Sequence, residues 1–254
     1  MPTNHPTQAN SAPAATPAVS LELAIHSSSL DSLIAAASDV ELNEDLALAL
    51  LKRLDLPGKV LEQLSKHGAL ITKSRKVKLA LVQHPKTPRH VSVPLLRHLF
   101  TFDLMQVALA PGVPGDIKKA AEEALLNRLE TISLGQKVSL ARRASARVAG
   151  ALLLDAEPRV ILAALENPQL TEPSVIRALA HRDASAAFVH TVCRHSKWSL
   201  RREIRIALLR NKNTPLARAL EFARALAPPI AREVLQASSL PDNIKSHLLK
   251  EIEK

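Results

Sequence analysis

The chain of 254 residues is poor in aromatic residues, glycine and cysteine, with four Phe, one Trp, no Tyr, six Gly and one Cys. One Cys excludes an intramolecular disulfide framework and a metal site made only of thiolates. A β-barrel, a β-sandwich or a glycine-rich nucleotide-binding sheet would lack its usual strand and turn residues. No apolar run approaches the roughly 18 to 20 residues that span a bilayer, and the N-terminus lacks the basic and apolar regions of a signal peptide. We therefore expect a soluble protein of a reducing compartment, the cytoplasm.

Alanine and leucine are abundant instead, with 39 and 43 copies, about a third of the chain. This composition predicts an all-α fold, and 46% hydrophobic residues are enough for a sizeable core. The first twenty residues contain four Pro and no Lys, Arg, Asp or Glu. Such a segment cannot bury enough surface to offset its ordering entropy. We predict a disordered tail over residues 1–20 and a helical-repeat domain over residues 21–254.

Most of the remaining prolines lie between short apolar helical segments, where a turn is followed by Thr-Pro, Val-Pro or Leu-Pro. We expect these dipeptides to open the next helix, with the proline in its first turn. Pro57, Pro88 and Pro114 are spaced by 31 and 26 residues, and Pro215 and Pro241 by 26. Self-similarity at this period predicts a right-handed α-solenoid of irregular two-helix repeats of about 26–31 residues.

Two longer intervals between prolines predict additional helices. The first should contain a degenerate unit at Leu134 to Leu153, and the second an extra helix at Ala184 to His195. Between Leu200 and Leu209, apolar residues at helical spacing predict a helix with one buried face.

Hydroxyl and carboxylate side chains next to the prolines are candidate helix caps. Thr87 and Thr214 precede Pro88 and Pro215, and we expect both hydroxyls to accept hydrogen bonds from the amides of the following helix. Thr171 is expected to cap one residue out of this register. Asp116 is the expected cap of the helix that starts near Ile117.

The turns resemble those of the leucine-rich-repeat-variant and HEAT-like class of α-helical repeat proteins. The resemblance is carried by Asn-Pro-x-Leu-Thr at residues 167–171, His-Pro-x-Thr-Pro at residues 84–88 and Asn-Thr-Pro at residues 213–215, and it covers roughly Leu46 to Ile252. It implies a fold and a binding role, not a reaction. The repeat-variant class can carry an N-terminal cluster held by cysteines, which this chain lacks.

The charge is unevenly distributed along the chain. Residues 1–60 hold seven acids and three bases, whereas the whole chain has a formal net charge of +10. No acid occurs between Glu62 and Asp103, an interval with eight Lys or Arg, and Arg194 to Lys212 holds seven bases with Glu203 as its one acid. Such a field attracts polyanions or acidic protein surfaces.

Corresponding helices of a solenoid line one surface, so bases at matching repeat positions would form a stripe. The candidate partner-binding residues are all basic: Lys76, Lys78, Arg89, Arg97, Arg142, Arg143, Arg147, Lys197, Arg201, Arg202 and Arg205. The alternative interpretation is a solvated face that keeps an Ala- and Leu-rich fold soluble.

Enzymatic interpretations have less support from the sequence. His190, Cys193 and His195 do not share one helix face, so we expect no metal site, and no cofactor is expected. Arg194 and the histidines favour a reactive Cys193 thiolate, but its apolar neighbours favour a core residue. A HEAT-like DNA glycosylase needs aromatic side chains around a flipped base, and Trp198 is the sole Trp.

We therefore expect a non-enzymatic repeat scaffold that binds a macromolecular partner, with an acidic protein segment as the first choice. The alternative is a nucleic-acid-binding protein that contacts the phosphate backbone without reading bases. An enzyme that uses Cys193 or the histidines is a third hypothesis. The acidic segment Asp39 to Leu46 is expected to fold against the basic part of the chain and compete with an acidic ligand.

Overall fold

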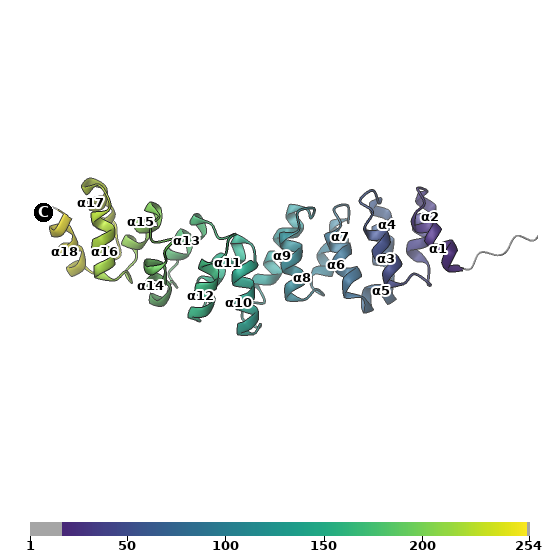
Figure 1. Ribbon diagram of the computed structural model, residues 1–254, viewed down its shortest axis with the longest axis horizontal. Coiled ribbons are helices and arrows are strands. Elements are labelled where there is room, and N and C mark those ends of the chain that lie inside the picture. The colour runs from purple at the N-terminus through teal and green to yellow at the C-terminus, as the bar shows by residue number, and fades with distance from the viewer. Residues whose placement is uncertain (1–16, 253–254) are drawn as a thin grey trace, which may run out of the picture. The chain divides into compact units, whose positions relative to one another are not determined.

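The computed structural model describes residues 17–252, and every regular element in that range is an α-helix (Figure 1). The prediction of an all-α fold is confirmed. The helices divide into two compact units, with the boundary between Leu99 and Phe100. Residues 1–16 of the predicted tail lie outside the described residues, and helix α1 begins at Pro17. The division into a tail and a single repeat domain stays a prediction.

The first unit contains seven of the described helices: α1 (Pro17–Ile25), α2 (Leu30–Ser38), α3 (Glu44–Leu51), α4 (Gly58–Ser65), α5 (Gly68–Lys73), α6 (Arg75–Gln83) and α7 (Arg89–Leu96). Helix α2 packs on α4 and α3 packs on α6. Each of these helices has an apolar face, and Leu50, Leu61 and Leu81 from these faces are fully buried.

The second unit contains the other eleven described helices: α8 (Thr101–Leu109), α9 (Gly115–Leu126), α10 (Leu134–Arg143), α11 (Ala146–Leu152), α12 (Pro158–Leu165), α13 (Glu172–Leu179), α14 (Ala186–Arg194), α15 (Arg202–Arg210), α16 (Leu216–Arg224), α17 (Pro228–Gln236) and α18 (Asp242–Ile252). Helices α10 and α11 lie in the segment predicted as a degenerate unit, and α14 is the predicted extra helix. The predicted helices are confirmed, whereas the repeat character of the first segment stays a prediction.

Helices two apart in the chain pack on each other in the second unit. The odd row consists of α9, α11, α13, α15 and α17, and the even row of α10, α12 and α14; each helix contacts the next in its row. Small residues allow close packing: a Cβ built on Gly150 of α11 would lie 3.3 Å from the Ser174 Cβ of α13. These rows decide which side chains become neighbours.

Polar side chains in the turns bind backbone carbonyls about one helix pair earlier. We call these bonds turn latches. Their distances are 3.0 Å from His67 to Asp39, 2.9 Å from His84 to Arg53, 2.7 Å from Asn167 to Ala141, 2.8 Å from Trp198 to Leu165, 2.8 Å from Asn211 to Leu179 and 3.2 Å from Asn213 to Ala184. The acceptors lie mostly at or just beyond helix C-termini, where carbonyls lack partners within the helix. The latches therefore fix these turns to segments one helix pair earlier in the chain.

His84 and Asn211 make the same pair of hydrogen bonds to the backbone. The His84 Nδ1 accepts from the Lys86 amide at 3.2 Å, which leaves the protonated Nε2 to donate to Arg53. Asn211 accepts from the amide of Asn213 through Oδ1, also two residues on, and donates through Nδ2. A His and an Asn therefore perform one structural role at these turns.

The predicted threonine caps are wrong. The Thr87 hydroxyl donates to the Leu81 carbonyl and the Thr214 hydroxyl to the Leu208 carbonyl, each at 2.6 Å, so both close the preceding helix. Thr171 occupies the N-cap position of α13, but its hydroxyl is bonded to the Ser174 hydroxyl at 2.9 Å instead of a backbone amide. Pro88 and Pro215 are the N-cap residues of α7 and α16 instead of residues of the first helical turn.

Two other expectations about helix starts need correction. Pro114, not Asp116, is the N-cap of α9, because the helix begins two residues earlier than expected. Helix α15 begins at Arg202, so Leu200 is 68% exposed, whereas Ile204 and Leu208 of the predicted stripe are fully buried.

Candidate interaction surface

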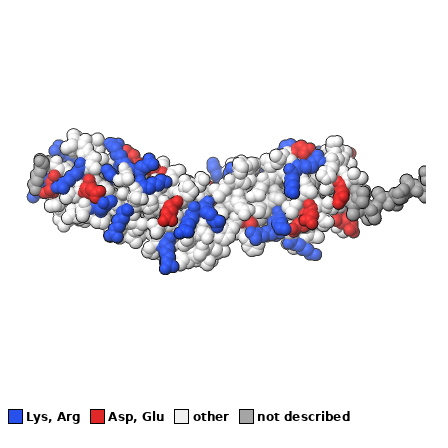
Figure 2. Space-filling model, in the orientation of Figure 1, with Lys and Arg blue, Asp and Glu red and all other residues white. Residues whose placement is uncertain are grey.

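The four basic candidates of the first unit lie on α6 and around α7. Lys76, Arg89 and Arg97 are exposed and Lys78 is half-buried. The Lys76 Nζ lies 3.0 Å from a Glu44 carboxylate oxygen, an ion pair within this unit. Figure 2 shows acidic and basic side chains together over these N-terminal helices.

Glu44 belongs to the acidic segment that was expected to fold against basic residues. Its carboxylate accepts a hydrogen bond from the Ser74 hydroxyl at 2.6 Å. This bond and the one from Lys76 hold the pKa of Glu44 below its usual value, and the pKa of Lys76 is raised by the same carboxylate. The contact joins α3 to α6, so this acid neutralises one of the predicted ligand-binding bases.

The predicted bases of the second unit are divided between the two rows. Arg142 and Arg143 end α10 of the even row, and Arg147 lies on α11 of the odd row. Lys197 and Arg201 lie in the turn before α15, and Arg202 and Arg205 lie on α15. All of these bases are exposed except Arg205, which is half-buried.

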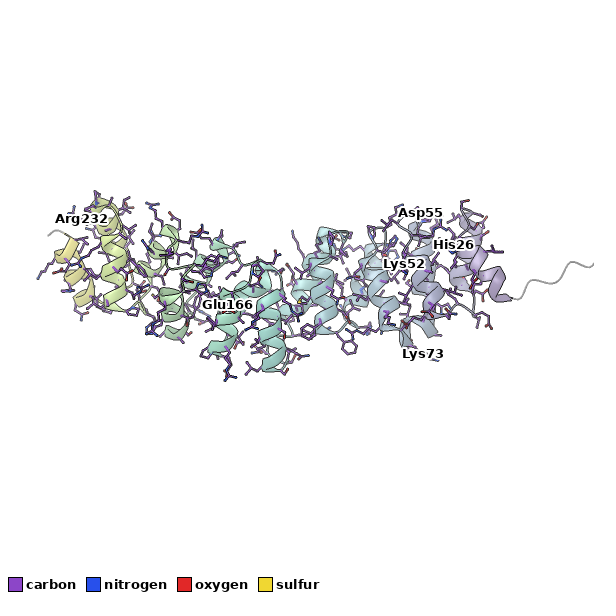
Figure 3. The ribbon with its side chains drawn as sticks, in the orientation of Figure 1. His26, Lys52, Asp55, Lys73, Glu166 and Arg232 are labelled. Carbon is purple, nitrogen blue, oxygen red and sulfur yellow. The ribbon has the colours of Figure 1, made fainter. Side chains whose placement is uncertain are left out.

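Several of these bases contact acidic or aromatic side chains. The Arg142 Nε lies 4.0 Å from a carboxylate oxygen of Glu166, which Figure 3 labels beside α12. Arg147 lies 3.7 Å from Glu122 and 3.6 Å from Glu123. Exposed pairs of this kind contribute only about 0 to 1 kcal/mol to stability, so they leave these bases available to a ligand.

Arg202 and Arg205 are engaged by neighbouring groups. The Arg202 Nη1 donates to Glu203 at 2.7 Å. The Arg205 Nε donates to the Ser199 carbonyl at 2.8 Å, and its guanidinium lies 5.8 Å from the centre of the Phe222 ring. Arg205 therefore has a structural role in the turn before α15.

The odd row carries two adjoining clefts lined by basic residues. A cleft of about 400 Å³ between α13 and α15 is lined by Arg182, Arg210 and Lys212, and a cleft of about 200 Å³ between α11 and α13 by Arg147 and Arg177. His181 lines both clefts, and neither is lined by an Asp or a Glu. We call these five Lys and Arg residues the basic trough.

Few carboxylates balance the trough. Asp183 lies 3.9 Å from Arg182, and Glu122 and Glu123 contact Arg147. In the described part of the chain, no carboxylate lies within 4.0 Å of the remaining three bases: Arg177, Arg210 and Lys212. Clefts lined by one sign of charge concentrate counter-ions, so the trough should attract anions.

Sequence reasoning named Arg147 as a site residue but missed the other four bases of the trough: Arg177, Arg182, Arg210 and Lys212. Arg147, Arg177 and Arg210 are spaced by 30 and 33 residues, close to the spans of 29, 32 and 33 residues that the turn latches bridge in this unit. A search for bases at the repeat spacing, in place of clusters along the chain, would have found this set.

Trp198 is not available for stacking on a base. Its side chain is 2% exposed and its Nε1 donates to the Leu165 carbonyl at 2.8 Å. Lys197 covers the ring at 4.2 Å from its centre. Phe188 and Phe222 are also buried. Recognition of an extrahelical base by these rings is therefore unsupported.

Cys193 lies in the core of the second unit. The residue is 1% exposed, and burial raises the pKa of its thiol from 9.0 to about 11 despite the nearby guanidinium of Arg218. The structure thus supports the core interpretation of this residue. Burial lowers the pKa of the neighbouring His195. Over residues 17–252 no three His, Cys, Asp or Glu side chains come together as a metal site.

Comparison with known proteins gave no match: no family model, no curated protein and no solved structure resembles the chain significantly. None of the helices in the described range has the length and apolar character needed to cross a membrane.

Proposed function

We propose that the chain is a non-enzymatic helical-repeat scaffold that binds an acidic segment of a partner protein in the basic trough. The underlying fold is a right-handed α-solenoid of two-helix repeats, of the leucine-rich-repeat-variant and HEAT-like class. Two features support stacking of this kind in the second unit: helices two apart pack in rows, and turn latches join points 26 to 33 residues apart. A single repeat cannot bury its own apolar face and must stack on the next.

The observation that carries the proposal is the placement of Arg147, Arg177 and Arg210 on successive helices of the odd row, around clefts lined by no carboxylate. Packed helices lie about 8 to 10 Å apart. A polyproline II segment rises about 3.1 Å per residue with three residues per turn, so every third side chain lies on the same face at about that interval. The trough therefore suits an extended segment with Asp or Glu at about every third position.

Phosphate-backbone binding is the alternative that the same charges would allow. A nucleic acid bound here would be held by phosphate contacts alone, because Trp198 and two of the phenylalanines of this unit are buried. Such binding would be insensitive to sequence and steeply salt-dependent, with a slope of about 0.9 per neutralised duplex phosphate.

The test compares two charge-reversed double variants of equal net charge. Arg177→Glu with Arg210→Glu changes the trough, whereas Lys197→Glu with Arg201→Glu changes exposed bases outside it. Fluorescence anisotropy with a labelled (Glu-Gly-Ser) repeat peptide should show at least about tenfold weaker binding for the trough variant and less than about threefold for the control. A (Gln-Gly-Ser) peptide of equal length measures the uncharged background.

The outcomes separate the hypotheses. Equal loss in both double variants would show a general charge effect and reject the trough. Absence of binding to the acidic peptide at low salt would reject the proposed ligand. Tighter binding to a random DNA duplex than to the peptide, lost in the trough variant, would replace the acidic segment by nucleic acid.

A further inference from the structure

A second groove of different character lies between α10 and α12, both of the even row. It has a volume of about 490 Å³, within the range of about 300 to 1,000 Å³ that ligand clefts occupy. One face of each helix lines it: Leu134, Gly135, Val138 and Arg142 from α10, and Arg159, Leu162 and Ala163 from α12. None of these residues belongs to the basic trough. This α10–α12 groove is fixed by two directly packed helices.

The two helices run in the same direction. Arg142 lies eight residues after the first residue of α10, and Glu166 lies eight residues after the first residue of α12. The Arg142 Nε is 4.0 Å from a carboxylate oxygen of Glu166, so the C-terminal ends of the two helices are side by side. The groove extends along α10 from Leu134 to Arg142, about 12 Å at 1.5 Å per residue. Leu134 lies near its beginning, and Leu162 lies about one helical turn further along.

Exposed apolar side chains form the floor and walls. Leu134 is 40% exposed and Leu162 is 46% exposed, although both lie on helices whose other faces are buried. A Cβ added to Gly135 would meet no atom within 4 Å, so the groove is open beside the first turn of α10. Large apolar side chains gathered in a polar-edged groove are typical of a binding site.

The edges of the groove are basic. Arg159 lies at the end where both helices begin, is exposed, and has no carboxylate within 4.0 Å among the described residues. Two helix N-termini add positive potential at the same end. At the other end Arg142 is balanced by Glu166. Figure 2 shows Lys and Arg side chains in a row over α10 and α12.

We propose that the α10–α12 groove docks an amphipathic helix of a partner protein. The partner helix inserts two leucine-sized side chains one turn apart against Leu134 and Leu162, and it places a carboxylate beside Arg159. Charge complementarity specifies the orientation, because Arg142 is paired with Glu166 whereas Arg159 has no carboxylate within 4.0 Å among the described residues. Helix-in-groove recognition uses apolar anchors at this spacing. The site goes beyond the acidic-segment binding proposed for the trough and is independent of it.

Gly135 provides a variant that blocks the groove without cutting into the core. Gly135→Leu fills the open space, while Gly135→Ala makes the same change of helix propensity with a small side chain. The probe is a labelled amphipathic peptide of about 16 residues, with leucines on one face and glutamates in its first turn. A peptide of the same composition in scrambled order is the specificity control.

We expect saturable binding of the amphipathic peptide to the natural chain and to Gly135→Ala, at least about tenfold weaker binding to Gly135→Leu, and weaker binding to Arg159→Glu. Equal affinities of the two Gly135 variants, equal affinity for the scrambled peptide, or no saturable binding below about 1 mM would each overturn the proposal. Binding of the (Glu-Gly-Ser) peptide should be unchanged in Gly135→Leu, which separates failure of the groove from failure of the trough.

Discussion

The side-chain amide of Asn167 donates to the backbone carbonyl of Ala141 at 2.7 Å, across 26 residues of the chain. It also donates to the carbonyl of Ala144 at 3.0 Å and accepts from the amide of Gln169 at 2.7 Å. Asn167 is fully buried, so water cannot replace these bonds. One side chain thus completes the C-terminal end of α10 and shapes the turn after α12.

Replacing Asn167 by Ala should destabilise the second unit by about 2 to 3 kcal/mol, because buried carbonyls lose their donor. Asn213→Ala is the matched control. Its single latch, at 3.2 Å to the Ala184 carbonyl, is only partly buried, and we expect a loss of about 1 kcal/mol or less. Urea unfolding measures both; equal losses would contradict the importance of burial at Asn167.

The hydrogen bond that the Thr214 hydroxyl donates predicts that a strong N-cap residue at this position destabilises the fold. Thr214→Asp should destabilise the fold, because a carboxylate cannot donate to the Leu208 carbonyl as the hydroxyl does. The expected loss is about 1 to 3 kcal/mol. If the side chain capped the next helix instead, Asp would be as good as Thr. Thr171→Asp, at an exposed N-cap position, should be neutral or stabilising in the same unfolding assay.

Cys193 should react slowly with iodoacetamide in the folded protein. The folded thiol has a pKa of about 11 against 9.0 for an ordinary thiol, so its thiolate fraction at pH 8 falls roughly a hundredfold, and burial slows access further. Alkylation followed by mass spectrometry, with urea-unfolded protein as control, gives the ratio. Comparable rates in the two states would contradict the core placement.

The same shift affects stability at high pH. Above pH 9 the unfolded chain loses the thiol proton while the folded chain keeps it, so the free energy of unfolding falls as the pH rises from about 9 to 11. Cys193→Ser or Cys193→Ala removes this contribution. The difference between natural and variant chains in this pH window should therefore shrink as the pH increases, as measured by urea unfolding at each pH.

Gly135→Ala should stabilise the second unit by up to about 1 kcal/mol. Gly135 is the second residue of α10, and a Cβ there meets no neighbouring atom within 4 Å. Gly150→Ala is the comparison, because its Cβ would lie 3.3 Å from Ser174. We expect a smaller gain there, or a loss. Thermal unfolding of the two variants checks the order.

The positions of the helices could be predicted from the sequence, because turns marked by proline and the spacing of apolar residues are local signals. The long intervals between prolines predict helices at Leu134 to Leu153 and Ala184 to His195, and the structure has α10, α11 and α14 there. The direction of the hydrogen bonds at Thr87 and Thr214 could not be predicted from the sequence. A hydroxyl next to a proline is able to donate to the preceding helix or to accept from the following one. Only the fold shows which backbone group is left without a partner.

The candidate surface was less predictable from sequence, because exposed charge depends on neighbours that lie about thirty residues away. Lys76 lies beside Glu44 and Arg142 beside Glu166, and neither acid is close to its base along the chain. Arg177 is isolated among uncharged residues in the chain, yet it joins Arg147 around one cleft. Clusters along the sequence and clusters in space therefore differ for this fold.

The short reach of the turn latches also affects how the chain acquires its structure. The longest of them, from Trp198 to Leu165, spans 33 residues. Contacts of such low sequence separation carry a small loop-closure cost and favour fast folding. As the chain leaves the ribosome, each helix pair meets its predecessor after only about thirty further residues, so assembly can proceed from the first pairs onward during synthesis.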